Sequence, residues 1–221
     1  MKAMILAAGR GERMRPLTLT TPKPLLCVGN MTLIDRALTE VRKAGIVEVV
    51  INVHHLGDQI MQHCGDGDAY GLQIQYSIED ELLDTGGGIY RALPFLGSDP
   101  FLLLSADIWT DFPLQKLTQQ SVEAAHLILV DNPEYHSTGD CGLDKNGIVR
   151  RHASQPFTYG NIGVFHPALF QHEKPGIFPL RSVLFPAIEQ GVVTGERYAG
   201  QWHNIGTPAD LNQANTFTSH C

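Results

Sequence analysis

The stretch LAAGRGERMRPLT (Leu6–Thr18) begins where a short apolar run at the start of the chain ends. Residues Lys2–Ala7 predict a buried strand, and a loop with two glycines, Gly9 and Gly11, follows it. Glycine carries no Cβ, so its backbone N–H groups can approach a phosphate chain closely. The arginines of the same loop can each meet phosphate oxygens with two hydrogen bonds. The stretch therefore predicts a strand followed by a phosphate-binding loop, which is the start of an α/β fold.

Two common phosphate-binding loops do not fit this stretch. The Rossmann fingerprint needs a third glycine where Met14 stands and an acidic residue where the second strand runs into His54 and His55. Adjacent strand residues point to opposite faces, so the two histidines are not expected to form a ligand pair. The Gly-Lys-Ser/Thr of a Walker loop is absent, and Lys23 comes later, between two prolines that restrict its position.

Strand-like and helix-like patterns alternate over the first 130 residues. Apolar runs bounded by polar residues predict strands, and apolar residues at helical spacing predict helices. Such a succession implies a mostly parallel sheet with both faces covered. The predicted strands are Lys2–Ala7, Val47–Val53, Leu72–Ile78, Phe101–Ser105 and Ala124–Val130, and the predicted helices are Leu33–Ala44, Asp58–Cys64 and one that begins within Gly87–Leu93.

The rhythm changes after about residue 131, where short segments with glycines follow. Asn146-Gly147 predicts a hairpin turn, and Pro208 predicts the first turn of a last helix. Between them we predict strands at Phe157–Phe165 and Val192–Tyr198 and a helix at Leu180–Gln190. No linker or repeat interrupts the sequence, so we expect one domain over residues 1–221, with one lobe at about 1–130 and a second at about 131–221.

Composition excludes several classes of protein. Apolar residues make up 43% of the 221 residues, which is typical of a folded globular chain. No apolar run approaches the about 20 residues of a membrane span, and the run before Arg10 is short for a secretory signal, so a cytoplasmic location is expected. A net charge of −7 argues against nucleic-acid or acidic-membrane partners. The four cysteines are scattered along the sequence, at Cys27, Cys64, Cys141 and Cys221, and we expect them to be reduced thiols.

Five motifs together resemble the sugar-1-phosphate nucleotidyltransferases. LAAGRGERMRPLT (Leu6–Thr18) and PKPLL (Pro22–Leu26) are similar to that family's opening signature and its lysine motif. LLDTGGGI (Leu82–Ile89) resembles its base-binding turn, LLLSADIW (Leu102–Trp109) its metal aspartate, and WHNIGTP (Trp202–Pro208) its second metal motif. The resemblance spans the whole chain and implies a Rossmann-like three-layer α/β sandwich with a mostly parallel central sheet, the GT-A-like fold.

The reaction that the resemblance implies is nucleotidyl transfer. The phosphate oxygen of a sugar 1-phosphate attacks the α-phosphorus of a nucleoside triphosphate, and pyrophosphate leaves. The nucleophile is already an anion, so catalysis is expected to rest on positioning and charge neutralisation. Arg13 is expected on the β- and γ-phosphates, and Lys23 on the α-phosphate or the attacking phosphate. The residues implied to bind the nucleotide are Leu6, Ala7, Ala8, Gly9, Gly11, Arg13, Lys23, Glu79, Gly86 and Gly87.

The resemblance also implies a Mg²⁺ site formed by Asp107 and Asn204. Asp107 ends the most apolar predicted strand, where α/β proteins place ligands, although it could instead cap the next segment. Many relatives carry aspartate where Asn204 stands, but an amide oxygen is also a suitable ligand. Glu79 could accept a ring N–H from uracil, thymine or guanine, or belong to a solvated acidic run.

The sugar is expected to contact Asp107, Gly139, Gly142 and Asn161, of which Asn161 could instead be a turn or bulge asparagine. A lysine common in glucose-1-phosphate relatives is absent before the predicted sugar-binding strand, and Arg150–His152 supplies cations there. The resemblance implies UTP as the nucleotide, and the cations near the predicted sugar-binding strand favour an acidic sugar phosphate; both are small-molecule substrates. A mannose- or other hexose-1-phosphate transferase using GTP or UTP remains an alternative, as does a non-catalytic nucleotide-sugar-binding regulator. A monomer is the favoured state.

Overall fold

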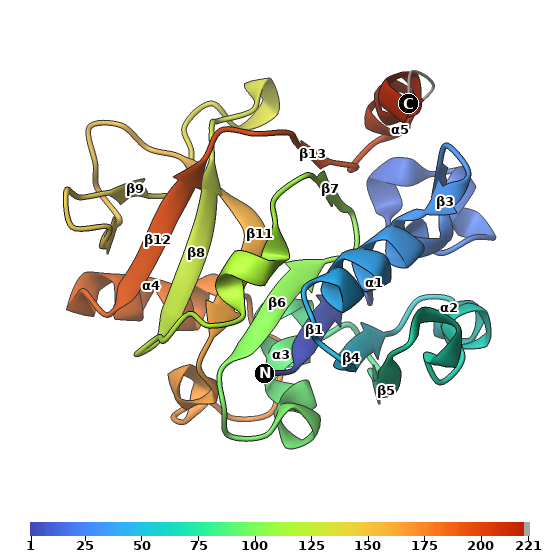
Figure 1. Cartoon of the computed structure of the whole chain (residues 1–221), viewed down its shortest axis with the longest axis horizontal. Helices are drawn as coiled ribbons and strands as arrows, with labels where there is room; N and C mark the ends of the chain where they lie inside the picture. The colour runs from blue at the N-terminus through green and yellow to red at the C-terminus, as the bar shows by residue number, and fades with distance from the viewer. Residues whose placement is uncertain (219–221) are drawn as a thin grey trace.

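A central seven-stranded sheet organises the computed structural model, which describes residues 1–218. The strand order is β12-β8-β11-β6-β1-β4-β5, and Figure 1 shows these strands fanning out side by side. Only β11 among the seven runs against its neighbours, so the predicted mostly parallel sheet is confirmed. The strands are β1 (Ala3–Leu6), β4 (Glu48–Val53), β5 (Gln73–Ile78), β6 (Phe101–Ser105), β8 (Ala125–Val130), β11 (Thr158–Phe165) and β12 (Val193–Tyr198).

Helices cover both faces of this sheet because side chains alternate along each strand. Ile5 points into the layer of α1 (Leu33–Lys43) and α2 (Gly57–Cys64) and belongs to one apolar cluster with Leu38 and Ile60. Met4 points the other way and packs in a second cluster with Ile89 of α3 (Asp84–Leu96) and with residues of α4 (Arg181–Gln190). Strands from both predicted lobes share the one sheet, and the three-layer α/β arrangement follows from these two clusters.

Local signals fix the helix ends. Thr32 caps α1, since its Oγ1 accepts a hydrogen bond from the Asp35 backbone at 3.1 Å. Gly191 ends α4 in the left-handed conformation at φ 77°. Helix α3 begins at Asp84, earlier than the predicted start at Gly87, and Asp84 itself has φ 60°.

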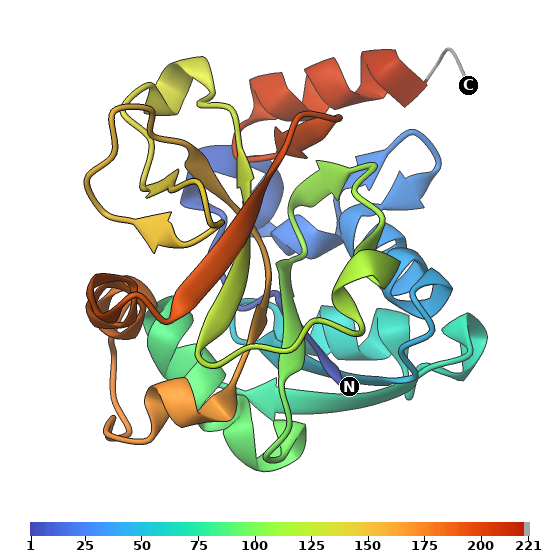
Figure 2. The same cartoon turned by 60° about the vertical axis from the view of Figure 1, so that its left-hand side comes forward.

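Short ladders and turns complete the chain above the sheet. Strand β13 (Trp202–Asn204) pairs antiparallel with β7 (Ile108–Thr110), and helix α5 (Pro208–Thr218) follows, lying along the top of the molecule in Figure 2. The predicted hairpin is present as β9 (Gly142–Leu143) and β10 (Val149–Arg150). The remaining elements are β2 (Cys27–Val28), β3 (Met31–Thr32) and the 3-10 helices Glu12–Met14, Leu17–Leu19, Lys23–Leu25, Asp68–Tyr70, Leu114–Leu117, Glu134–His136 and Pro167–Phe170.

Three of the four cysteines lie within the described residues. Cys27, Cys64 and Cys141 are free thiols, and the latter two are buried. Cys221 lies outside the described residues. Within residues 1–218, none of the helices has the length and apolar character that crossing a membrane requires.

Candidate functional site

A cavity of about 610 Å³ opens where β1, β4, β5 and β6 end. This is the carboxyl edge of parallel strands, the usual ligand position in α/β folds. The cavity brings together most of the predicted nucleotide-binding residues and the predicted metal aspartate. Those that line it are Leu6, Ala7, Ala8, Gly9, Gly11, Arg13, Lys23, Glu79 and Asp107, together with Glu12, Pro24, Asn52, Leu82, Asp84, Thr85, Ser105, Ala106, Ile177 and Gly206.

The predicted phosphate loop wraps one end of this cavity. Gly11 has φ 61°, and a Cβ there would stand 2.8 Å from Thr18 Cγ2, so glycine is required by both conformation and space. The Thr18 hydroxyl donates to the Gly11 carbonyl at 2.7 Å, which closes the loop on itself. A Cβ built on Gly9 meets nothing within 4 Å. The backbone at Gly9 is therefore open to a ligand in the cavity.

Lys23 and Asp107 form an ion pair on the wall of the cavity. Lys23 lies in the 3-10 helix Lys23–Leu25, and Asp107 lies just beyond β6. Their side chains are 13% and 26% exposed, respectively, so the pair is shielded from bulk water but still faces the cavity. Arg13 approaches the same wall, because a Cβ on Gly206 would be 3.3 Å from its guanidinium. Three charged groups expected to meet the phosphates and the metal thus converge on one place.

Asn204 is held beside Asp107 by the β7–β13 ladder. Its register partner is Ile108, and the Ile205 backbone donates to the Asp107 carbonyl at 2.9 Å. The Asn204 side chain lies near the Tyr135 hydroxyl, and its Oδ1 is buried and has no hydrogen-bond partner within residues 1–218. A buried amide oxygen without a donor is rare, and beside a carboxylate it suits a hard cation.

Glu79 also lines the cavity and is 3% exposed, so it is not part of a solvated acidic run. Its Oε1 accepts a hydrogen bond from Asn52 Nδ2 at 2.7 Å, and its Oε2 accepts one from the Leu83 backbone at 3.1 Å. The neighbouring histidines are also engaged with backbone: His54 contacts the Glu79 carbonyl and His55 the Thr18 carbonyl, both at 2.9 Å.

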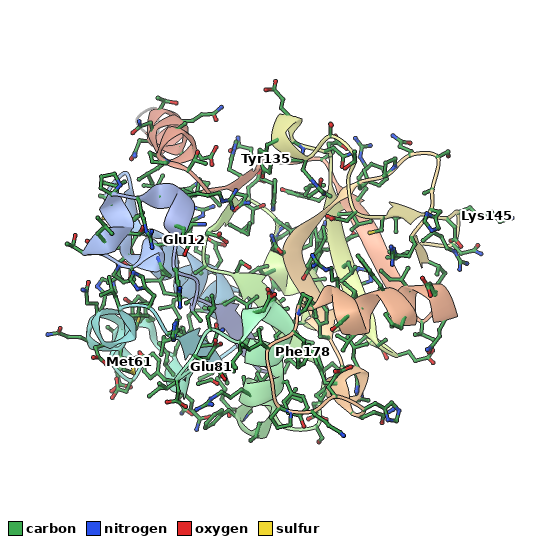
Figure 3. All side chains as sticks on the ribbon, turned by 180° about the vertical axis from the view of Figure 1, so that it is seen from behind. Glu12, Met61, Glu81, Tyr135, Lys145 and Phe178 are labelled. Carbon is green, nitrogen blue, oxygen red and sulfur yellow. The ribbon has the colours of Figure 1, made fainter. Side chains whose placement is uncertain are left out.

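Gly86 and Gly87 pack against the chain at residues 176–178. Phe178 lies over the start of α3 (Figure 3), and Gly87 N donates to the Phe178 carbonyl at 3.0 Å. A Cβ on Gly86 would be 2.5 Å from the Phe178 ring, and one on Gly87 would be 2.2 Å from the Gly176 carbonyl oxygen. The close approach of this chain segment requires both glycines. It also places Ile177, which the sequence did not single out, on the wall of the cavity.

Gly87→Ala is expected to lower the melting temperature, although alanine ordinarily favours a helix over glycine. The Gly176 carbonyl is backbone and cannot move aside as a flexible side chain would, so overpacking should cost about 1–3 kcal/mol. Thermal unfolding followed by circular dichroism measures the change. Gly9→Ala, where the added methyl meets open space, is the matched control. A melting temperature for Gly87→Ala equal to or above that of the parent would contradict this packing.

A second cavity of about 400 Å³ adjoins the first and shares Asp84 and Thr85 with it. Asn161 lines it from a bulge in β11, where the register shifts between Tyr159 and Gly163 and Asn161 has φ 55°. The asparagine is therefore both a bulge residue and a cavity residue. The other residues that line this cavity are Leu127, Tyr135, His136, Asp140, Cys141, Thr158, Tyr159, Pro179, Leu180, Arg181, Leu184, Phe185, Ile188, Trp202 and Asn204.

Gly139 and Gly142 flank the cavity residues Asp140 and Cys141. A Cβ on Gly139 would be 2.7 Å from Asn132 Oδ1, and one on Gly142 would be 2.3 Å from the Ala153 Cβ. Both glycines thus allow close packing of the loop that carries the lining residues. Asp140 is fixed in that loop because its Oδ2 accepts a hydrogen bond from the Tyr159 backbone at 2.8 Å.

None of the predicted cations of the second lobe, Arg150, Arg151 and His152, is among the residues that line this cavity. Arg150 is engaged by Asp144, which accepts two hydrogen bonds from it at 3.1 and 2.8 Å. Arg151 stacks on the Phe185 ring, with its guanidinium carbon 3.6 Å from the ring centroid. Arg181, which the sequence analysis missed, does line the cavity. Its signal was a cation in the first turn of a helix, where the macrodipole disfavours positive charge.

Two titratable groups of the second cavity are neutral near pH 7. Burial raises the pKa of the Cys141 thiol to about 12, so it is not a thiolate nucleophile. Burial also raises the pKa of the Tyr159 hydroxyl, which is buried and lacks a hydrogen-bond partner in the described part of the chain. The second cavity is lined by hydroxyl and amide side chains, by the acidic residues Asp84 and Asp140, and by Arg181, and this polar lining is suited to a polyhydroxylated ligand.

Comparison with known proteins shows which family this chain resembles over most of its length. Residues 2–156 match the family model described as nucleotidyl transferase. The chain is 43% identical to the N-acetylmuramate alpha-1-phosphate uridylyltransferase of Neisseria meningitidis serogroup B, over 97% of this chain and 96% of that protein. It is 34% identical to the enzyme of the same name from Caulobacter vibrioides, over 93% and 92% of the two chains. A mannose-1-phosphate guanyltransferase of Aspergillus oryzae is 29% identical over 96% of this chain and 62% of its own length.

Solved structures share the fold. A crystal structure from Bacillus anthracis, assigned as a glucose-1-phosphate thymidylyltransferase, superposes with a TM-score of 0.87 at 23% identity over 100% of this chain and 96% of its own. HddC from Yersinia pseudotuberculosis superposes with a TM-score of 0.83 at 18% identity, covering 98% and 99% of the two chains. The predicted Rossmann-like α/β fold is confirmed. Together with the match over residues 2–156, the two uridylyltransferase relatives show that this chain belongs to the nucleotidyl transferase family.

Proposed function

We propose that the protein transfers the uridylyl group of UTP to N-acetyl-α-muramate 1-phosphate, giving UDP-N-acetylmuramic acid and pyrophosphate. The observation that carries the proposal is the convergence of Arg13, Lys23 and Asp107 in one cavity that ends in a glycine-rich loop. The relatives with 43% and 34% identity carry the name of this reaction. The product, UDP-N-acetylmuramic acid, is a nucleotide sugar. We propose that the protein forms it in the cytoplasm during recycling of peptidoglycan.

The N-terminal lobe, about residues 1–130, is proposed to hold the nucleotide. The open backbone at Gly9 approaches the triphosphate, and Arg13 binds the β- and γ-phosphates that leave as pyrophosphate. A phosphate oxygen of the sugar 1-phosphate forms a bond to the α-phosphorus, and the bond from that phosphorus to the β-phosphate oxygen breaks. No proton moves, so no general base is needed. Lys23 neutralises charge where these two bonds change.

Asp107 and Asn204 are proposed to hold one Mg²⁺ ion. The buried Asn204 Oδ1, which has no hydrogen-bond partner among the described residues, and the neighbouring carboxylate of Asp107 fit a cation that prefers oxygen ligands. When bound, Mg²⁺ supplies positive charge against the phosphates. Lys23 is paired with Asp107 in this structure, and a cation held by that carboxylate would leave the Lys23 ammonium able to contact the α-phosphate.

The C-terminal lobe, about residues 131–218 of the described chain, is proposed to bind the sugar in the second cavity. Asn161 and Thr158 present polar groups there, and Arg181 brings a cation. N-acetylmuramic acid carries a lactyl carboxylate, which an arginine can bind with a charge-assisted hydrogen bond. The Aspergillus relative supports the alternative substrates, mannose 1-phosphate and GTP. A non-catalytic regulator would need neither Lys23 nor Asp107, and both stand in the cavity.

The purified protein is expected to prefer N-acetylmuramic acid 1-phosphate with UTP over the N-acetylglucosamine, glucose and mannose 1-phosphates. One charge-assisted hydrogen bond to the carboxylate should raise kcat/KM about tenfold or more over N-acetylglucosamine 1-phosphate, which lacks it. Pyrophosphate release measured for each sugar phosphate with UTP and with GTP gives the comparison. A clear preference for mannose 1-phosphate with GTP would transfer the proposal to the alternative.

A further inference from the structure

Two buried polar side chains, Asn52 and Glu79, are hydrogen-bonded to each other on the wall of the larger cavity. They are 4% and 3% exposed, and both line the cavity. Asn52 lies in β4, between β1 and the edge strand β5, and Glu79 directly follows β5. The transfer step proposed above uses neither side chain. Burial of an amide and a carboxylate costs free energy unless their polar atoms are hydrogen-bonded, so both side chains need partners inside the protein.

Their hydrogen bonds form one continuous chain across three strand ends. The Ala7 backbone donates to Asn52 Oδ1 at 2.8 Å, and Asn52 Nδ2 donates to Glu79 Oε1 at 2.7 Å. The Leu83 backbone donates to Glu79 Oε2 at 3.1 Å. Ala7 begins the phosphate loop and Leu83 lies in the turn before α3. The side-chain pair therefore connects two segments, one beginning at Ala7 and one around Leu83, that both contribute residues to the cavity wall.

The surroundings leave room for this pair and little else. A Cβ on Gly88 would stand 2.6 Å from Glu79 Oε1 and 2.9 Å from Asn52 Nδ2, so the third glycine of the TGGG run makes space for the pair. The Leu83 peptide is fixed on its other side as well, because its carbonyl accepts a hydrogen bond from Phe178 N at 3.1 Å. An apolar pair could fill the same volume but could not hold the Ala7 and Leu83 N–H groups.

We infer that Asn52 and Glu79 are positioning residues for the nucleotide. By joining Ala7 to Leu83, they set the separation between the phosphate loop (Ala7–Gly11) and the turn at Leu82–Thr85, so that the triphosphate and the base of one nucleotide fit at the same time. In this role Glu79 acts through the backbone of the turn, and its oxygens do not read the base. The inference rests on the proposed function, since it takes the ligand of this cavity to be a nucleoside triphosphate.

Glu79→Gln tests the inference because a carboxamide offers one acceptor where the carboxylate offers two. Either Asn52 Nδ2 or the Leu83 N–H then faces an NH₂ group and loses its partner. The Kd for UTP, measured by calorimetry, and the KM for UTP are expected to rise about tenfold. The KM for the sugar phosphate should change less than about twofold, because the pair lies in the nucleotide cavity. Glu81→Gln, at an exposed position nearby (Figure 3), is the control for loss of one charge and should bind UTP like the parent.

The double variant Asn52→Asp with Glu79→Gln reverses the direction of the central hydrogen bond. The new carboxylate at position 52 accepts from Ala7 N and from the new amide at position 79, whose oxygen accepts from Leu83 N. Every donor is again satisfied, and UTP affinity should return to within about threefold of the parent. Asn52→Asp alone sets two carboxylates against each other and should bind UTP worse than either of the other variants.

The results separate this inference from the proposed function. A parent that binds UTP but does not use the muramyl phosphate overturns the proposed sugar, while the UTP affinities of the variants still test the pair. Parent-like UTP affinity in Glu79→Gln overturns the pair. So does a double variant that keeps the parent melting temperature yet stays tenfold weaker, which would assign Glu79 to direct reading of the base. A parent that binds neither UTP nor GTP overturns both.

Discussion

Lys23→Ala is expected to lower kcat by about two to three orders of magnitude, the usual cost of removing one charged contact to the transition state. The Lys23 ammonium stands in the cavity against Asp107, where it can turn to the phosphate at which charge develops. The melting temperature should change little. Asp107 is 26% exposed, so water can solvate its carboxylate once the lysine is gone.

Lys145→Ala is the matched control for this experiment. Lys145 is exposed in the turn between β9 and β10 and lies on the far side of the molecule from Glu12 of the phosphate loop (Figure 3). Lys145→Ala removes one positive charge, as Lys23→Ala does, and should leave the rate of pyrophosphate release equal to that of the parent. Turnover by Lys23→Ala within a few-fold of the parent, with folding intact, would show that Lys23 does not take part in the transfer.

The parallel half of the sheet could be predicted from the sequence because its signals are local. The uninterrupted apolar run Phe101–Ser105 is strand β6 to the residue, since a strand buried on both faces needs no polar alternation. Helix α1 ends just before Gly45, which has φ 84° and interrupts the helical backbone there. The hairpin at Asn146-Gly147 was likewise predicted from its turn residues.

The β7–β13 ladder could not be predicted in this way. Each strand has three residues, too few for a periodic pattern, and the two segments come from distant parts of the sequence. This ladder is nevertheless what sets Asn204 beside Asp107. The sequence pointed to both residues only through their resemblance to the family's motifs, and the tertiary pairing supplies the physical reason that they meet.

For some residues, the reason that one amino acid is needed lies in a distant part of the chain, so the surrounding sequence could not predict it. Gly86 and Gly87 were predicted to meet the base, which stays a prediction, and the structure gives a separate reason for glycine at both positions. The space that a Cβ would need at each is taken by residues 176–178, about 90 positions later in the chain. Glu79 stands in an acidic run that looks solvated, but Asn52 and Leu83 hold it in the interior. Neither neighbour can be recognised from the sequence around Glu79.

Asp107→Ala is expected to remove most of the transferase activity, by about a hundredfold or more, and a chelator should abolish activity in the parent until Mg²⁺ is added back. The Asp107 carboxylate is the charged member of the proposed pair of ligands, and the described residues contain no group of three or more histidine, cysteine, aspartate or glutamate side chains that could hold a metal ion in its place. Excess Mg²⁺ should therefore restore little activity to this variant.

Variants of Asn204 decide whether the buried amide oxygen is the second ligand. Asn204→Asp keeps a ligand oxygen and adds a negative charge, so it should stay active and reach half-maximal rate at an equal or lower Mg²⁺ concentration. Asn204→Ala removes the oxygen that has no partner within residues 1–218, and its half-maximal Mg²⁺ concentration should rise about tenfold or more. Asn212→Ala, at an exposed position on α5, should titrate like the parent. If Asn204→Ala also titrates like the parent while Asp107→Ala is inactive, the metal is held by Asp107 without Asn204, and the unpaired amide oxygen has another cause.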